Sequence, residues 1–368
     1  MKAITDSQCY VPLLKAKEGE FGALEALDWD VRTNVVPLIE VPRIPYDYAS
    51  SRPSKNLEAH VSGLAERIRR AWGEAPFYLD LPWFGESTTQ HLESGHLAVS
   101  VLLHDCIQRG IRPTAVVALD RSPEYIDAVR QYLSQCEDRF CLRLTPADFD
   151  EDRPDPRDRV DSLLERLGVG GADRGDLIVD LQGLELDVNR ALLLARGLLS
   201  AAPRLNEWRR VVLAAASFPE NLSDVDAETA STIPRLEREL WQRIRKRPGN
   251  LRTDLAFGDY AIAHPVPTEL DPRTMRMSAS IRYTTEADWL IVKGRNVRQY
   301  GFDQYYKLCK YLVTRPEYSG ADYSWGDWYI QECANANLGP GNATTWRKVG
   351  TNHHLTLVAK RLSIEFGS

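Results

Sequence analysis

The chain has 368 residues with a formal net charge of −6 and a pI near 5.8, so it has no global basic field that would attract nucleic acid. Its six cysteines are scattered, without a Cys-x-x-Cys pair or zinc-finger spacing, and no apolar window of about 18 residues predicts a membrane span. Because the start also lacks the apolar core of a signal peptide, we expect a cytoplasmic protein with reduced thiols and no structural zinc.

Eight short apolar segments have the character of buried strands, and most of them end in a charged or polar residue. In chain order they are 10–17, 35–42, 77–82, 115–120, 140–144, 177–181, 210–217 and 257–262. Helical apolar spacing separates them, most clearly over residues 57–72, 97–107, 123–136, 160–167, 188–199 and 233–244.

This alternation of strands and helices predicts a parallel sheet, and eight units predict closure into a TIM-like (β/α)8 barrel over residues 1–264. A doubly wound open sheet is the main alternative. No Gly-x-Gly-x-x-Gly follows the first strand, which removes the commonest reason to prefer a dinucleotide-binding fold.

The pattern changes over residues 265–368, which we expect to form a C-terminal extension that packs on the barrel. Residues 278–284 and 289–294 are predicted to form a hairpin, and helices are expected near 304–313, 328–336 and 352–362. This segment is richer in Trp and Tyr, which is typical of a part that covers a mouth or contacts a partner.

Charged residues at the strand ends are the main functional candidates, because all strands of a barrel direct their carboxyl ends to one rim. The predicted catalytic set is Lys15, Lys17, Glu40, Asp80, Arg143 and Asp180. Ser217 and, more weakly, Asp120 are further rim candidates, since an Asp before Ser-Pro is often a loop or cap residue. Lys15 and Lys17 share one face of their strand because side chains alternate.

Two interpretations of these charges stay open. In the first, a carboxylate acts as general base or holds a divalent cation, and Lys and Arg bind an anionic group. The cofactor is then unknown, with a divalent cation as one option. In the second, the same charges form a salt-bridged plug that closes the barrel. The first is favoured modestly, because barrel active sites lie at this rim.

The other motifs give weaker evidence for a functional site. His353 and His354 point in different directions if helical, so at most one can join a site, and the sequence favours ordinary first-turn histidines behind an N-cap at Thr351 or Asn352. The run 339–342 is predicted to be a turn, and Gly-x-Ser-x-Gly and His-Glu-x-x-His are absent, which disfavours serine hydrolases and zincins.

Several short motifs, taken in order, resemble the beta protein family, which is named after a gene product of a satellite phage and occurs in bacterial genomes and mobile elements. These motifs are Tyr10–Lys15 with Lys17 and Gly19-Glu20, Pro37–Glu40, Leu79-Asp80, Leu142–Leu144, Ser217–Pro219, Phe257–Tyr260, and Trp346-Arg347 with His353–Leu355. The resemblance implies a link to phage defence and to the restraint of a toxic neighbouring gene product. It assigns no catalytic residues.

Two functions follow as hypotheses. The first is a cytosolic barrel protein of a phage-defence or toxin–antitoxin cluster, which binds a partner protein encoded by a neighbouring gene, a toxin or defence effector. The second is a barrel enzyme that acts on a phosphorylated or nucleotide-like small molecule, with metal-assisted hydrolysis as one form. A nucleic-acid reader that uses the arginine-rich runs at 67–70 or 243–247 is disfavoured, because such runs are usually solvated helix faces, and no membrane partner is expected.

Overall fold

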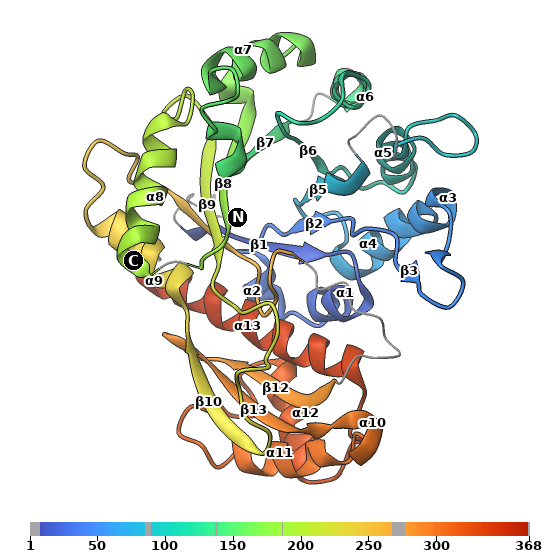
Figure 1. The fold of residues 1–368 in the computed structure, drawn as a ribbon, viewed down its shortest axis with the longest axis vertical. Coiled ribbons are helices and arrows are strands. Elements are labelled where there is room, and N and C mark those ends of the chain that lie inside the picture. Colours follow the sequence, from blue (N-terminus) through green and yellow to red (C-terminus); the bar gives the residue numbers. More distant parts are fainter. Residues whose placement is uncertain (1–7, 85–89, 137–138, 186, 267–276, 367–368) are drawn as a thin grey trace.

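Eight parallel strands form a closed barrel in the computed structural model, which describes residues 8–84, 90–136, 139–185, 187–266 and 277–366. Around the barrel the strands follow the order β1-β11-β9-β8-β7-β6-β5-β2 (Figure 1). They are β1 (Tyr10–Lys15), β2 (Leu38–Glu40), β5 (Tyr78–Asp80), β6 (Thr114–Val117), β7 (Phe140–Leu144), β8 (Gly175–Gly183), β9 (Arg210–Ala216) and β11 (Ala256–Asp259). The predicted α/β barrel is confirmed, and the open sheet is excluded.

Helices between the strands cover the outside of the barrel (Figure 1). They are α1 (Glu18–Glu25), α2 (Trp29–Arg32), α3 (Leu57–Val61), α4 (Leu64–Trp72), α5 (Ala98–Gln108), α6 (Pro123–Cys136), α7 (Pro156–Leu167), α8 (Val188–Ala201) and α9 (Leu236–Lys246). Helix α4 is typical: it buries Leu64, Ile68 and Trp72 on one stripe, as its apolar spacing predicts. The loops add a small hairpin and short 3-10 helices: β3 (Tyr46–Asp47), β4 (Arg52–Pro53), Pro82–Phe84, Pro146–Phe149 and Ala172–Arg174.

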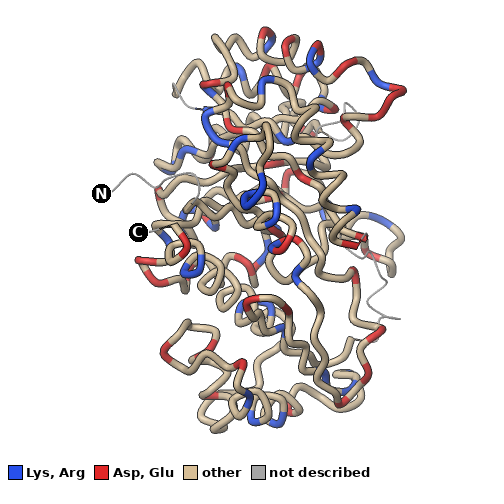
Figure 2. The backbone as a smooth tube through the Cα atoms, turned by 90° about the vertical axis from the view of Figure 1, so that its left-hand side faces the viewer, with Lys and Arg blue, Asp and Glu red and all other residues tan. Residues whose placement is uncertain are grey.

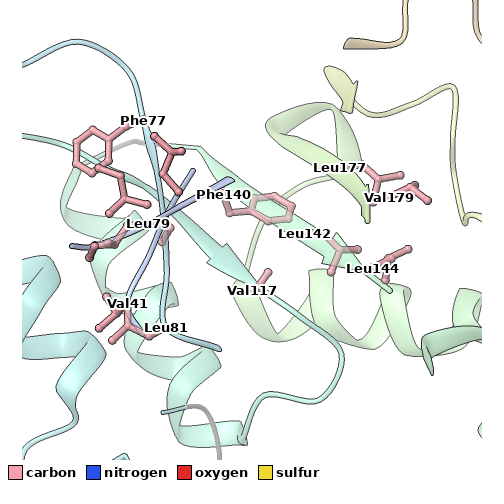
Figure 3. Packing of buried hydrophobic residues seen from close by; sticks show 14 of the residues in the cluster. Val41, Phe77, Leu79, Leu81, Val117, Phe140, Leu142, Leu144, Leu177 and Val179 are labelled. Carbon is pink, nitrogen blue, oxygen red and sulfur yellow. The ribbon is translucent and has the colours of Figure 1, made fainter. Parts of the chain in front are cut away.

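Side chains of the barrel strands alternate between the lumen and the helix layer. On β7, Phe140, Leu142 and Leu144 pack in the large apolar cluster beneath the helices (Figure 3). Cys141 belongs to the separate cluster that fills the lumen, so Arg143, two residues further on, also points inward. The period of the strand therefore places a guanidinium group at the inner carboxyl end of the barrel.

The C-terminal extension is a three-stranded antiparallel sheet with helices on one face (Figure 1). It contains β10 (Thr229–Pro234), β12 (Ser278–Thr284), β13 (Asp288–Asn296), α10 (Val297–Tyr300), α11 (Gln304–Leu312), α12 (Trp325–Ala334) and α13 (Ala343–Phe366). The predicted hairpin is confirmed in the β12–β13 pair. Strand β10 comes from the loop between the seventh and eighth barrel strands and pairs with β13, so this sheet includes residues outside the predicted 265–368 segment.

Helix α13 lies between the barrel and the three-stranded sheet (Figure 1). It begins at Ala343, earlier than the predicted helix, because the Asn342 side chain accepts the Thr345 N–H at 3.1 Å and acts as N-cap. Its two sides pack against different neighbours, so its buried positions show no single stripe. None of the helices in the described part of the chain is long and apolar enough to cross a membrane.

Candidate functional site at the barrel mouth

Three of the predicted site residues occupy directly paired positions at the carboxyl ends of neighbouring strands. Lys15 on β1 pairs in register with Glu40 on β2, and Glu40 pairs with Asp80 on β5. The Lys15 Nζ forms an ion pair with Glu40 and donates to the Pro265 carbonyl at 3.0 Å. Parallel strands of a barrel end at one rim, and this register brings the three charges together there.

Arg143 lies at the centre of the mouth and binds three carboxylates. Its Nη1 lies 3.2 Å from Glu40 Oε2 and 2.7 Å from Asp80 Oδ2. Its Nη2 and Nε donate to Asp180 Oδ2 at 2.7 and 3.0 Å. Burial opposes the charge of Arg143, but Tyr260 and the three carboxylates raise its pKa well above the usual value. This guanidinium is therefore fixed in its charged form.

Tyr260 and Arg121 complete the group, and sequence reasoning missed both. The Tyr260 hydroxyl donates to Asp180 Oδ2 at 2.6 Å and accepts from Arg143 at 2.8 Å. Burial is the main cause that raises the Tyr260 pKa. Arg121 Nη2 lies 3.1 Å from Asp80 Oδ1. We call the set Lys15, Glu40, Asp80, Arg121, Arg143, Asp180 and Tyr260 the mouth cluster.

Asp120 and Lys17 lie outside the mouth cluster. Strand β6 ends at Val117, so Asp120 falls in the following loop, where its side chain is 61% exposed and pairs with Arg121. Lys17 follows the end of β1, immediately before α1, and is exposed. The structure thus brings together five of the six predicted catalytic residues: Lys15, Glu40, Asp80, Arg143 and Asp180. Asp120, the weaker rim candidate, does not join them, whereas its neighbour Arg121 does.

The charges of the mouth cluster balance: three carboxylates face two guanidinium groups and one ammonium group, all largely buried. Buried charges are tolerated when they are paired in this way. Among the described residues no group of His, Cys, Asp and Glu is arranged to hold a metal ion. A catalytic role for the predicted residues, and a divalent cation among them, therefore stay predictions.

A second buried polar group lies between β11 and α13. Asp259 Oδ2 lies 2.9 Å from His354 Nε2, and Asp259 Oδ1 accepts the Tyr10 hydroxyl at 2.5 Å. The Thr284 hydroxyl lies 2.9 Å from His354 Nδ1. Burial lowers the pKa of His354, so this imidazole is neutral at pH 7. Nε2 then carries the proton and donates it to Asp259, while Nδ1 accepts from Thr284.

Ser217 does not join the mouth cluster. Its hydroxyl donates to Glu237 at 2.5 Å and accepts the Leu236 N–H at 2.9 Å. Arg235 connects this pair to the group between β11 and α13, with its Nε 3.2 Å from Glu237 and its Nη2 3.6 Å from Asp259. The serine therefore fixes the start of α9.

His353 makes its own contacts on the other side of α13. Its Nδ1 lies 2.8 Å from Asp327 Oδ2 and its Nε2 lies 2.8 Å from the Thr284 carbonyl. The prediction of first-turn histidines was wrong, because the helix begins at Ala343 and both rings are fully buried in its middle. One histidine joins the helix to β11 and the other joins it to α12, as two adjacent helical residues that face apart allow.

One protein family matches most of the chain. The model of a family described as Beta protein matches residues 10–360. No curated protein matches the chain.

Solved structures of low identity also resemble the chain. A type I 3-dehydroquinate dehydratase from Clostridium difficile with covalently modified comenic acid is 15% identical, with 70% of this chain and 86% of that chain covered and a TM-score of 0.36. A mutant tryptophan synthase alpha-subunit from Pyrococcus furiosus is 12% identical, with coverages of 70% and 89% and a TM-score of 0.40. A 3-hexulose-6-phosphate synthase is 11% identical, with coverages of 68% and 90% and a TM-score of 0.32. We draw no functional conclusion from likenesses at this level.

Proposed function

The chain belongs to the beta protein family, and from this premise we propose that it is the binding component of a phage-defence or toxin–antitoxin gene cluster. It binds a partner protein encoded by a neighbouring gene and restrains or assists that partner. The observation that carries the proposal is an exposed groove on the C-terminal extension, lined by aromatic side chains and by charged side chains with a small basic excess.

The groove has a volume of about 530 Å³ and lies between α11 and the start of β10. Tyr300 and Tyr311 line it and are 45% and 41% exposed. Its floor includes Ala230 of β10 and Val292 of β13, which are paired neighbours in the sheet. Exposed aromatic side chains over an apolar floor are typical of the anchors that hold protein partners.

Strand β10 gives the groove a second means of binding. It is an edge strand of the three-stranded sheet, and its residues alternate between exposed and half-buried. In the described chain only β13 pairs with it. An exposed edge offers backbone N–H and C=O groups to an extended segment of another protein. The groove beside the edge would then receive alternate side chains of that segment.

The charge of this region indicates an acidic partner segment. Residues 288–315 carry six Lys or Arg against two Asp, whereas the whole chain has a formal net charge of −6. The groove itself is lined by Lys293, Arg295 and Lys307 against Glu228 and Asp303, and Glu228 pairs with Arg295. A small excess of positive charge remains. Figure 2 shows basic and acidic residues interspersed at the lower end of the molecule, where the extension is. Complementary charges increase the rate of encounter and select among partners. We therefore expect the bound segment to be extended and acidic.

Co-expression with the products of the flanking genes tests the proposal. A stable complex, or relief of the toxicity of one product, is expected. The double variant Tyr300→Ala/Tyr311→Ala should weaken the complex by about tenfold or more, because exposed aromatic anchors commonly contribute over 1 kcal/mol each. Tyr46→Ala is the matched control, since Tyr46 is 47% exposed on the barrel. If neither complex nor rescue is seen, the proposal fails.

The second candidate is a barrel enzyme that acts on a phosphorylated or nucleotide-like substrate. It is favoured by the position of the mouth cluster at the carboxyl ends of the strands, where barrel enzymes carry their active sites. Lys15 and Arg143 are already paired with carboxylates, so an anionic substrate would have to displace these pairs. Glu40→Gln and Asp180→Asn test it: a folded variant with full biological activity excludes catalysis by that carboxylate.

A further inference from the structure

Two arginines from distant segments share one backbone carbonyl at the barrel mouth. Arg282 of β12 donates from Nη1 to the Ile262 carbonyl at 2.9 Å, and Arg347 of α13 donates from Nη1 to the same oxygen at 3.1 Å. One acceptor holds both guanidinium groups, so they lie side by side although like charges repel. Each group keeps further N–H donors for another acceptor.

The region carries more positive than negative charge. Glu20 is the acid beside it, and its Oε1 lies 3.8 Å from Arg347 Nε. Among the described residues neither Arg282 nor Lys17 forms an ion pair, and Arg282 instead lies 4.9 Å from the centre of the Phe218 ring. Three cations, Lys17, Arg282 and Arg347, thus depend on one carboxylate.

The pKa values of Arg282 and Lys17 indicate the same excess of positive charge. Burial, and then the charge of Arg347, lower the pKa of Arg282 to about 9. Partial desolvation lowers the pKa of Lys17 as well, and Arg347 and Lys15 add to this effect while Glu20 opposes it. Cations that are held together in this way without sufficient counter-charge are stabilised by a bound anion.

The local backbone is built to hold this arrangement. Arg347 passes close to α1 at Gly19, where a Cβ atom would lie 2.5 Å from Arg347 Cγ. Ala261, next to the shared carbonyl, has a φ of +52°, in the left-handed region, and Asp259 Oδ1 accepts its N–H at 2.9 Å. A non-glycine residue in this conformation is strained, and such strain is found preferentially at functional sites.

The position within the barrel also suits an anion. Phe218 follows the seventh barrel strand, β9, and Ile262 follows the eighth, β11. In α/β barrels the loops after these two strands frequently hold phosphate groups. Here the cations come from the residue before α1, from β12 and from α13 rather than from these two loops. The loops supply the carbonyl and the ring that fix the two arginines.

We propose that Lys17, Arg282 and Arg347 form a binding site for the phosphate group of a small phosphorylated ligand. The two guanidinium groups donate to the phosphate oxygens, and Lys17 adds charge from the solvent side. The cavity beside them, lined by Lys15, Glu20 and Arg347 among others, holds only about 10 Å³. The phosphate therefore binds on the outer side, where Lys17 is exposed and the Arg347 side chain is 30% exposed.

Titration of the full chain with inorganic phosphate and with glycerol 3-phosphate tests this site. Calorimetry and thermal unfolding are run at matched ionic strength against chloride. Both phosphates should bind and raise Tm with concentration, the monoester at least as tightly. If chloride gives the same shift, or if inorganic phosphate binds and the monoester does not, the proposal is overturned.

Variants assign the binding to these residues. Arg282→Met should weaken phosphate binding by about tenfold to a hundredfold, the range for one charge-assisted contact. Without phosphate it should also raise Tm, because it removes the repulsion from Arg347. A merely structural arginine would instead lower Tm in both buffers.

Two further variants keep the test decisive if Arg282→Met does not fold. Lys17→Met changes an exposed side chain and should weaken phosphate binding several-fold while leaving Tm in chloride unchanged. Arg190→Met removes an arginine that is 75% exposed on α8 and should bind phosphate as the parent chain does. Equal affinity of the Lys17, Arg282 and Arg190 variants would exclude the site.

Discussion

Arg143 binds one oxygen of Asp180 through two nitrogens, at 2.7 and 3.0 Å, while the rest of its guanidinium group binds two further carboxylates. We expect Arg143→Met to lower the free energy of unfolding by about 3–5 kcal/mol, because three buried carboxylates lose their common cation. Urea unfolding at pH 7 measures the loss. Arg166→Met removes an exposed arginine that pairs with Asp127 and should cost about 1 kcal/mol or less. Equal losses would show that the mouth cluster is not held by Arg143.

Asp120 and Arg121 are adjacent in sequence but differ in environment. Asp120→Asn should change the stability by about 0.5 kcal/mol or less, since the carboxylate is exposed. Arg121→Met should cost several times more, because it leaves a lone pair of the fully buried Asp80 without its partner. Comparison of their urea midpoints checks the assignment of Arg121 to the mouth cluster. A larger effect of the Asp120 variant would contradict it.

The pH dependence of stability should report on His354. Its pKa in the folded chain lies below the ordinary value of 6.5 because of burial, so the unfolded chain binds the proton more readily. The contribution of His354 to the stability is therefore fully present above about pH 6.5, and it declines as the pH falls towards the pKa of the folded chain. His354→Gln should reduce this slope in urea titrations between pH 7 and 5. His60, whose pKa burial also lowers, accounts for part of the slope that remains. An unchanged slope would mean that the pKa of His354 is the same in the folded and the unfolded chain.

Gly19 and Gly197 form a matched pair of helical glycines. Gly19→Ala places a methyl group 2.5 Å from Arg347 Cγ, and we expect a loss of about 1–3 kcal/mol from overpacking. Gly197→Ala on α8 meets no atom within 4 Å and should gain up to about 1 kcal/mol from helix propensity. Thermal unfolding of both variants measures the difference. If the two substitutions have the same sign, α1 does not pack against α13 at this point.

The sequence predicted the barrel because strand and helix periods follow from local patterns. The same periods predicted that Lys15, Glu40, Asp80, Arg143 and Asp180 converge, since strand order and direction alone bring their ends to one rim. The catalytic or structural role of these residues is not a local property. It depends on which charges pair, and that is decided by side chains from several strands at once.

Other features could not be read from local patterns. Strand β10 is short, polar and exposed, so it carries no apolar alternation, and its partner β13 is remote in sequence. The start of α13 was placed too late because the helix is buried on two sides and lacks a single apolar stripe. Arg282 and Arg347 meet only because β12 and α13 both pack at the barrel mouth.

The path of β10 ties the two parts of the molecule to each other. After β9 the polypeptide leaves the barrel, supplies an outer strand to the distal sheet, and then returns to close the barrel with β11. A fragment that ends after β11 would contain all eight barrel strands but would leave β10 without its partner β13. The complementary C-terminal fragment would lack β10, the outer strand of its sheet. Neither fragment is a complete folding unit, so we expect the barrel and the three-stranded sheet to unfold together.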